Sequence, residues 1–295
     1  MPDTRAVAVI LEALVEVMAD NEEGVIERRD DEFLHDFRVA VRRTRSALSL
    51  FGTVLPPAVL RRGRRFFKDL GGRTNPARDL DVLLLALPVY AEELSAADRE
   101  GLEALEEQIT AERARQYAGI RRWLEGKTYR RAIAAWRSDL AKLSSTDGGG
   151  TMAVRAAKAI RKAAARANRQ TAELGTGDRD AAIHRLRIRF KKLRHALEFS
   201  RSLTPGAEVQ SFIGSLKRLQ DELGAHQDLV VHGERLAELA RASQSGSVVL
   251  ILVGDRLVES LRRRRSILRE SIEADVAGFR RVARSELERV LAALG

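Results

Sequence analysis

The stretch HDFRVAVRRTRSAL, at residues 35–48, contains one histidine and four arginines and has no acid after its second residue. The stretch HRLRIRFKKLRHAL, at residues 184–197, repeats this pattern 149 positions later. On a helix with about 100° per residue, the cations of each stretch fall on one arc and the apolar residues on the neighbouring arc. Each stretch therefore predicts a helix that packs against a core and carries a cationic stripe. The stripes are His35, Arg38, Arg42 and Arg45 in the first helix and His184, Arg187, Lys191 and Arg194 in the second.

The same shift of 149 aligns residues well beyond the two stretches. Lys68 meets Lys217, and Asp79-Leu80 meets Asp228-Leu229. One register held over 46 positions indicates an internal repeat. We therefore predict two homologous, antiparallel helical bundles with long helices, packed about a pseudo-twofold axis.

The remaining sequence favours an all-α class, because long segments have helical periodicity and strand-like alternation is absent. Residues 144–151, SSTDGGGT, are typical of a linker. This linker divides a single unit, 1–295, into an N-terminal bundle at 1–145 and a C-terminal bundle at 152–295. We expect helices at 4–22, 31–52, 57–72, 76–88, 95–124, 127–142, 152–173, 179–202, 205–223, 225–242, 246–271 and 273–293.

Composition points to an anionic partner. The 295 residues include 52 lysines and arginines against 42 acids, for a formal net charge of +10, while 44% hydrophobic residues suffice for a folded core. The absence of cysteine excludes disulfides, thiolate catalysis and cysteine-bound metals. The N-terminus has no basic signal-peptide region, and the longest apolar runs, near 82–90 and 248–253, are too short to span a bilayer. We expect a cytoplasmic protein without membrane association.

Acids are missing where the cations cluster. There is no Asp or Glu from 37 to 67 or from 181 to 197. Unpaired like charges at i,i+4 cost a few tenths of a kcal/mol each, so their retention in both repeats favours a bound anion over a solvated helix face. Acids from other helices remain the alternative partners. The candidate anion-binding residues are His35, Arg38, Arg42, Arg43, Arg45, Arg64, Arg65, Lys68, Arg78, His184, Arg187, Lys191, Lys192, Arg194 and Lys217.

Some of these residues have two interpretations. His35 and His184 lie near helix starts, where each either contacts the anion or orients a neighbouring helix. Arg78 either contacts phosphate or pairs with Asp81. Asp79 and its repeat partner Asp228 are interpreted mainly as structural, bonded to Arg or His of the repeat helices.

The two stripes, with NPARDLDV at 75–82 and LQDELGAHQD at 219–228, resemble the conserved-histidine α-helical domain family, CHAD. The resemblance covers nearly the whole chain, although His195 stands where an aromatic residue, typically Tyr, is expected. It implies two bundles that form a basic groove or pore, binding of inorganic polyphosphate, and association with polyphosphate granules. Many members follow an N-terminal triphosphate tunnel domain with an E-x-E-x-K motif. That motif is absent here, so we expect a stand-alone, non-hydrolytic module.

Two other classes of function compete with polyphosphate binding. Proteins that bind single-stranded nucleic acids combine a basic groove with aromatic side chains on which the bases stack. Only 5% of the residues of this chain are aromatic. Non-specific binding of long double-stranded RNA or DNA stays open. An enzyme or metal site is not expected, because Asp79 and Asp81, and likewise His226 and His232, do not share one helix face. We therefore expect no cofactor and no metal, and the sequence leaves the oligomeric state open.

Overall fold

The computed structural model describes residues 2–145, 149–174, 177–203, 206–242 and 248–292. Within these ranges the chain is helical and contains no strand, only an isolated bridge between Pro2 and Thr151. The predicted all-α class is therefore confirmed. None of the described helices has an apolar stretch long enough to cross a membrane.

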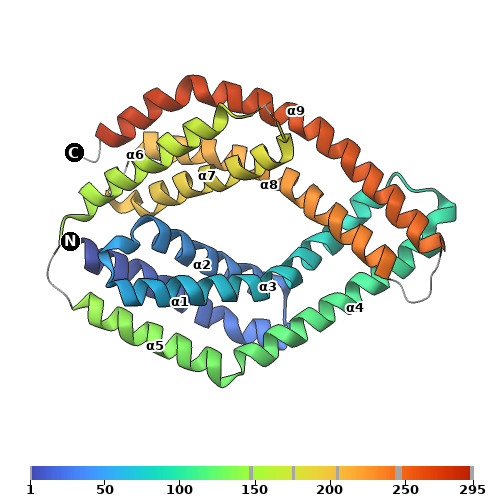
Figure 1. Cartoon of the computed structure of the whole chain (residues 1–295), viewed down its shortest axis with the longest axis horizontal. Coiled ribbons are helices and arrows are strands. Elements are labelled where there is room, and N and C mark those ends of the chain that lie inside the picture. The colour runs from blue at the N-terminus through green and yellow to red at the C-terminus, as the bar shows by residue number, and fades with distance from the viewer. Residues whose placement is uncertain (1, 146–148, 175–176, 204–205, 243–247, 293–295) are drawn as a thin grey trace.

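The helices run in the order shown in Figure 1. The first five α-helices precede the glycine-rich segment at 144–151, and the other four follow it. They are α1 (Asp3–Glu27), α2 (Asp31–Leu50), α3 (Pro57–Ala91), α4 (Arg99–Leu124), α5 (Lys127–Ser144), α6 (Met152–Thr171), α7 (Arg179–Phe199), α8 (Ala207–Ala242) and α9 (Val248–Ala292), with short 3-10 turns at Gly52–Val54, Ala96–Asp98 and Arg201–Leu203.

The apolar arcs of the two repeated helices lie in two separate cores. In the first, Phe37 and Leu48 of α2 pack with Phe67 of α3 and Trp136 of α5, and each is at most 3% exposed. In the second, Phe190 of α7 packs with residues of α6, the first part of α8 and the end of α9. Burial of these arcs leaves the cationic stripes to face away from each core.

A third core combines elements from both sides of the 144–151 segment. Leu83 of α3 and Ile109 of α4 pack with Leu236 of α8 and Leu257 of α9, and all four are fully buried. Figure 1 shows the reason: α3 and α8 each run past their own bundle and converge with α4 and α9 at one end. The order α1, α2, α3 followed by α6, α7, α8 agrees with the expected repeat, and the duplication itself stays a prediction.

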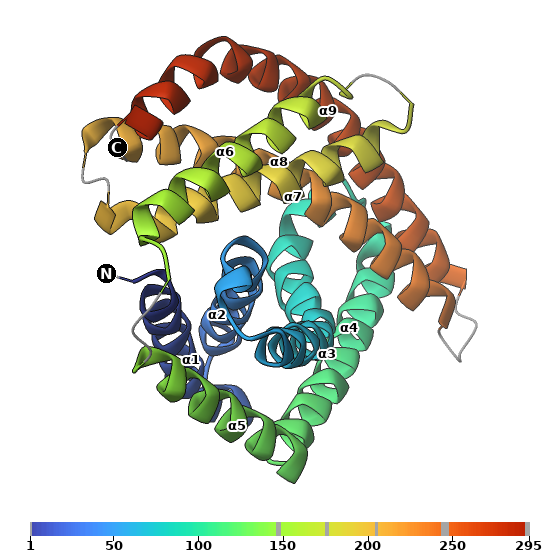
Figure 2. The same ribbon diagram turned by 60° about the vertical axis from the view of Figure 1, so that its left-hand side comes forward.

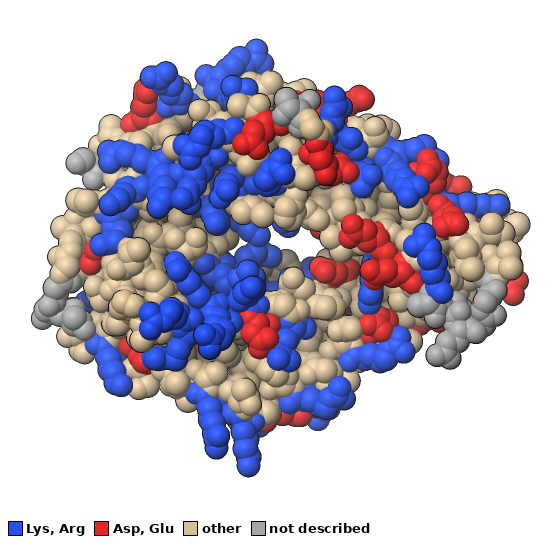
Figure 3. Space-filling model, viewed as in Figure 1, with Lys and Arg blue, Asp and Glu red and all other residues tan. Residues whose placement is uncertain are grey.

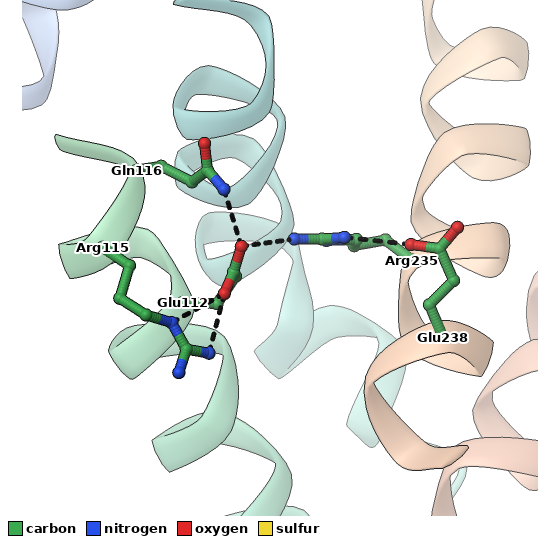
Figure 4. A network of polar contacts seen from close by, with 5 residues as sticks. All are labelled: Glu112, Arg115, Gln116, Arg235 and Glu238. Atoms are coloured by element: carbon green, nitrogen blue, oxygen red, sulfur yellow. Dashed lines mark hydrogen bonds and ion pairs between the residues drawn. The ribbon is translucent and has the colours of Figure 1, made fainter. Parts of the chain in front are cut away.

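Polar contacts also join the halves beside this third core. Glu112 of α4 accepts hydrogen bonds from Gln116 at 2.7 Å and from Arg235 of α8 at 3.1 Å (Figure 4). Arg235 pairs in addition with Glu238 at 2.9 Å, and Glu112 with Arg115 at 2.7 Å. This network fixes α8 against α4, although Arg235 and Glu112 are more than a hundred residues apart in the sequence.

Three predicted helix breaks were wrong. The helices expected at 57–72 and 76–88 form the single helix α3. Likewise, those expected at 205–223 and 225–242 form α8, and those expected at 246–271 and 273–293 form α9. Asn75-Pro76 therefore does not start a helix, because Pro76 and Pro88 lie inside α3. A proline removes one backbone hydrogen bond, but the buried stripe of α3 continues on both sides of Pro76, with Leu70 and Leu80 fully buried.

Two further expectations concern helix starts. The helix expected at 95–124 begins with a capping box, in which the Ser95 N–H donates to Asp98 at 2.9 Å. The first residue of the helix expected at 205–223 lies outside the described residues.

Candidate functional site

Three residues of each cationic stripe line one cavity. It has a volume of about 590 Å³ and lies between α2, α3, α7 and α8. The sequence alone left open whether the stripes share one channel. Figure 3 shows an opening through the molecule in this region, with Lys and Arg gathered above and below it. The basic residues that line the cavity are Arg38, Arg42 and Arg45 of α2 and His184, Arg187, Lys191 and Lys192 of α7.

The positions of α2 and α7 follow from local sequence and from packing between the halves. Asp30 caps the start of α2 by accepting the Glu32 N–H at 2.8 Å, and Asp178 caps α7 by accepting the Ala181 N–H at 3.1 Å. At the other ends of these helices, the Phe51 and Phe199 rings meet edge to face at 6.0 Å. Figure 2 shows α2 and α7 facing each other between the two groups of helices.

Burial and mutual repulsion both act on the cations of the cavity. Burial, followed by the charges of Arg187 and Arg194, lowers the pKa of Arg42. Burial and then Arg187, Arg42 and Arg45 lower the pKa of Lys191 to about 7. In the described part of the chain, no ion pair joins an acid to any of the six lysines and arginines that line the cavity. The free protein therefore gathers these six cations around only two carboxylates, Asp79 and Asp228, and a bound anion would relieve the repulsion among the cations.

Arg38 lies deepest among the cations of α2. Its Nη1 donates to Thr74 Oγ1 at 3.0 Å, and burial lowers its pKa to about 10. Thr74 is itself fully buried and donates to the Leu70 carbonyl at 2.9 Å. These bonds hold the Arg38 guanidinium against α3, so this side chain is ordered before any ligand arrives.

Two carboxylates limit the cationic surface. Asp79 of α3 and Asp228 of α8 also line the cavity, and burial raises the pKa of each despite the opposing charges of Arg38 on Asp79 and Arg187 on Asp228. Figure 3 shows acids gathered on one side of the opening and cations on the other. Asp79 and Asp228, interpreted from sequence as mainly structural, thus lie on the wall of the site.

Two predicted site residues have an acidic partner. Glu198 pairs with Arg43 at 3.2 Å and with Arg194 at 3.3 Å, and neither arginine lines the cavity. The acid-free span identified from sequence ends at 197, one residue before this carboxylate. Arg43 also lies over the Phe199 ring at 5.3 Å. Arg43 therefore joins α2 to α7, whereas the Arg194–Glu198 pair lies within α7.

Other predicted residues lie outside the cavity lining. Arg64 donates to the Leu48 carbonyl at 3.2 Å and so satisfies the end of α2. Arg65, Lys68 and Lys217 are exposed on α3 and α8. They widen the basic surface without joining the cavity.

His35 and Arg78 are neighbours of the cavity. Burial and then the charge of Arg78 lower the pKa of His35, which lies beside Glu32 and Asp36 on the same turn of α2. The three could present ligand atoms within 4.8 Å of one another, but the adjacent arginine opposes a cation. Arg78 does not pair with Asp81 in the described chain. Its Nη1 is buried without a hydrogen-bond partner.

A family model for the CHAD domain matches residues 9–237. The chain belongs to the CHAD domain family. Its structure resembles the CHAD domain from the plant Ricinus communis, at 29% identity and a TM-score of 0.79 over 94% of this chain and 92% of that one. The fold also resembles PptA from Streptomyces chartreusis, at 19% identity and a TM-score of 0.71 over 93% of this chain and 99% of that one.

The curated relatives of this CHAD protein are longer. Two uncharacterised proteins of Mycobacterium tuberculosis, from strains CDC 1551 and H37Rv, are each 31% identical over 225 residues, which is 72% of this chain. The chain spans about two fifths of their length, 41%. The family-model match and the similarity to the Ricinus communis CHAD domain confirm the resemblance inferred from the duplicated motif.

Some cavity residues of this CHAD domain were not singled out from sequence. Asn75 and Gln227 both line it, and the Gln227 side chain is hydrogen-bonded to His184 Nδ1. His232 lines it too; it is hydrogen-bonded to the Tyr90 hydroxyl at 2.9 Å, and burial lowers its pKa to about 4. The 149-residue shift marks Asp228 beside Gln227 but carries no signal for these polar neighbours. His195, the departure from the family pattern, is buried against Phe199.

Proposed function

We propose that the cavity binds inorganic polyphosphate. The observation that carries this proposal is the convergence of six lysines and arginines, from two helices far apart in sequence, on one cavity without acidic partners on those helices. Polyphosphate carries about one negative charge per unit and has no bases, so it needs cations at regular spacing and no stacking surface. Arginine offers planar, bidentate donors to phosphate oxygens, and lysine offers a compact charge.

The arrangement favours a polymer over a single phosphate. Each stripe extends about 15 Å at 1.5 Å per residue, so several phosphates of one chain can contact it at once. Because α2 and α7 face the same cavity, one chain can neutralise both stripes. A protein that holds polyphosphate in this way would gather at polyphosphate granules in the cytoplasm, where we propose that it acts.

Nucleic-acid binding is the second candidate. The lack of aromatic side chains in the described lining of the cavity argues against it. Of the described residues that line the cavity, none is Phe, Tyr or Trp. Trp136 packs edge to face on Phe67 at 5.3 Å in the first core, and Trp123 lies in a cluster with Tyr129 and Phe66. Single-strand readers gain about 1–3 kcal/mol per base from stacking on such rings, and this cavity lacks them.

Calorimetric titration with long-chain polyphosphate tests the proposal. We expect tighter binding per phosphate than for single-stranded RNA of the same charge, and weak binding of tripolyphosphate. Affinity should fall as salt rises, because binding releases counterions. Equal affinity for RNA and polyphosphate would contradict the proposal and favour a general polyanion surface.

Binding should weaken above neutral pH. The pKa of Lys191 in the free protein is about 7, whereas a lysine in an unfolded chain titrates near about 10.4. Between these values, Lys191 therefore holds fewer protons in the folded protein than in the unfolded chain. Its destabilisation of the free fold is complete below pH 7 and decreases as the pH rises. Bound phosphate favours protonated Lys191, so binding takes up a proton above pH 7.

Affinity measured at pH 6.5, 7.5 and 8.5 checks this. The expected loss approaches about tenfold per pH unit above pH 7, the limit for uptake of one proton. His184, Asp79 and Asp228 also face the cavity, so Lys191→Met serves as the control, and its profile should be nearly flat. A profile as steep as that of the wild type would assign the proton to another group.

A further inference from the structure

A second cavity, of about 380 Å³, lies between α6, α7, the start of α8 and the end of α9. Its floor is aromatic. The Phe279 ring of α9 lies 5.2 Å from Phe190 of α7 and 5.9 Å from Phe212 of α8, with which it is stacked. Phe190 and Phe212 are at most 1% exposed, and Leu193 completes the floor. This cavity shares no described lining residue with the cationic one.

The repeat predicted from sequence pairs small side chains of α6 with large ones of α1. At the repeat spacing of 149, Ala164 corresponds to Val15 and Ala167 to Met18. Val15 and Met18 are each 1% exposed and fill the first core, whereas both alanines line the cavity. At these two positions the predicted repeat gives α6 less side-chain volume than α1, and a well-packed interior does not normally leave a cavity unfilled.

The rim of the cavity is cationic. Arg161 of α6 and Arg280 of α9 line it and are exposed, and in the described chain neither has an ion-pair partner. Arg284 also lines it but pairs with Glu288 at 3.1 Å. An apolar floor below two unpaired guanidinium groups is complementary to a molecule with an apolar body and a negatively charged head.

We propose that this cavity binds a small amphiphilic anion, with its carboxylate or phosphate head on Arg161 and Arg280 and its apolar body on the phenylalanine floor. The volume lies within the range of roughly 300–1,000 Å³ that is typical of small-molecule sites. Polyphosphate has no apolar part and does not suit this floor. The proposal is therefore independent of the function proposed for the cationic cavity.

Two fluorescent probes with the same ring system separate the roles of floor and rim. 8-Anilinonaphthalene-1-sulfonate carries a charged head, and N-phenyl-1-naphthylamine lacks it. We expect both to bind the wild-type protein, and the charged probe to bind more tightly. Ala164→Val/Ala167→Met, which copies the residues of α1, should weaken both probes at least tenfold without lowering the melting temperature.

The rim has its own variant. Arg161→Gln/Arg280→Gln should weaken the sulfonate probe about tenfold and leave the uncharged probe within twofold. Displacement of the sulfonate probe by decanoate and by decyl phosphate then identifies the preferred head group, and displacement by neither overturns the proposal. It is also overturned if the filled variant binds both probes like the wild type, or if the rim variant leaves the sulfonate probe unaffected. Polyphosphate affinity should be unchanged in the filled variant, which distinguishes failure here from failure of the proposed function.

Discussion

Arg42→Glu/Lys191→Glu is expected to abolish polyphosphate binding near physiological salt. Arg42 and Lys191 come from the two facing helices. Burial and then the charges of Arg187 and Arg194 lower the pKa of both, and the charge of Arg42 also lowers the pKa of Lys191. A hydrogen bond to a charged group contributes about 1.5–3 kcal/mol, so losing two of them costs at least about 3 kcal/mol. That loss alone exceeds about 100-fold in affinity, and repulsion by the two new carboxylates adds to it.

A matched control separates the site from net charge. Arg131 of α5 and Lys158 of α6 are exposed and line neither cavity described above, and Arg131→Glu/Lys158→Glu changes the net charge by the same amount. Calorimetry should show the control within about threefold of the wild type, since only screened, long-range attraction is lost. Equal loss in both variants would mean that binding follows overall charge and not the cavity.

The same pair of variants tests granule association. A fluorescent fusion of the wild-type protein and of the control should gather at polyphosphate granules, and the charge-reversed protein should be diffuse. Thermal unfolding accompanies these tests. Removing two mutually repelling cations should leave the melting temperature unchanged or raise it, so loss of binding with an intact fold indicates loss of the site.

The sequence predicted the chemistry of the stripes better than their surroundings. Spacing alone put Arg38, Arg42 and Arg45 on one helix face, and the structure brings them into one cavity with Arg187. Helical periodicity cannot say what lies opposite a helix face. Likewise, the lack of acids near Arg43 in sequence gave it a role in binding, whereas Glu198 of the other half pairs with Arg43.

The long helices show the same limit for the fold. Pro76 and Gly224 are local signals for a break, and both lie inside helices. Continuity there depends on the third core, where α3 and α8 pack with α4 and α9. Local propensity is a weak prior, and burial of residues from distant segments overrides it. That core joins segments on both sides of the 144–151 linker, which a division into two bundles does not anticipate.

Asp81→Ala is expected to lower the free energy of unfolding by about 3–5 kcal/mol. The Asp81 side chain is fully buried, and it accepts hydrogen bonds from Arg113 Nε at 2.6 Å and from the Tyr117 hydroxyl at 2.9 Å. Arg113, only 19% exposed, also bonds Asp31 at the start of α2. The truncation leaves the buried Tyr117 hydroxyl without its acceptor and the Arg113 guanidinium without one of its two carboxylate partners. It therefore loosens the contact between α4, α3 and α2.

Asp69→Ala, on the same helix, is the matched control for Asp81→Ala. Asp69 pairs with Arg73 at 2.8 Å, but both side chains are about half exposed, so this change should stay within about 1 kcal/mol. Urea denaturation of both variants with a common m-value checks the comparison, and equal stabilities would show that the buried network contributes no more than a surface pair. Because Asp81 does not line the cationic cavity, the Asp81→Ala protein should still bind polyphosphate wherever it remains folded. A loss of affinity in folded Asp81→Ala would instead mean that the network positions α2, and with it the stripe that starts at His35.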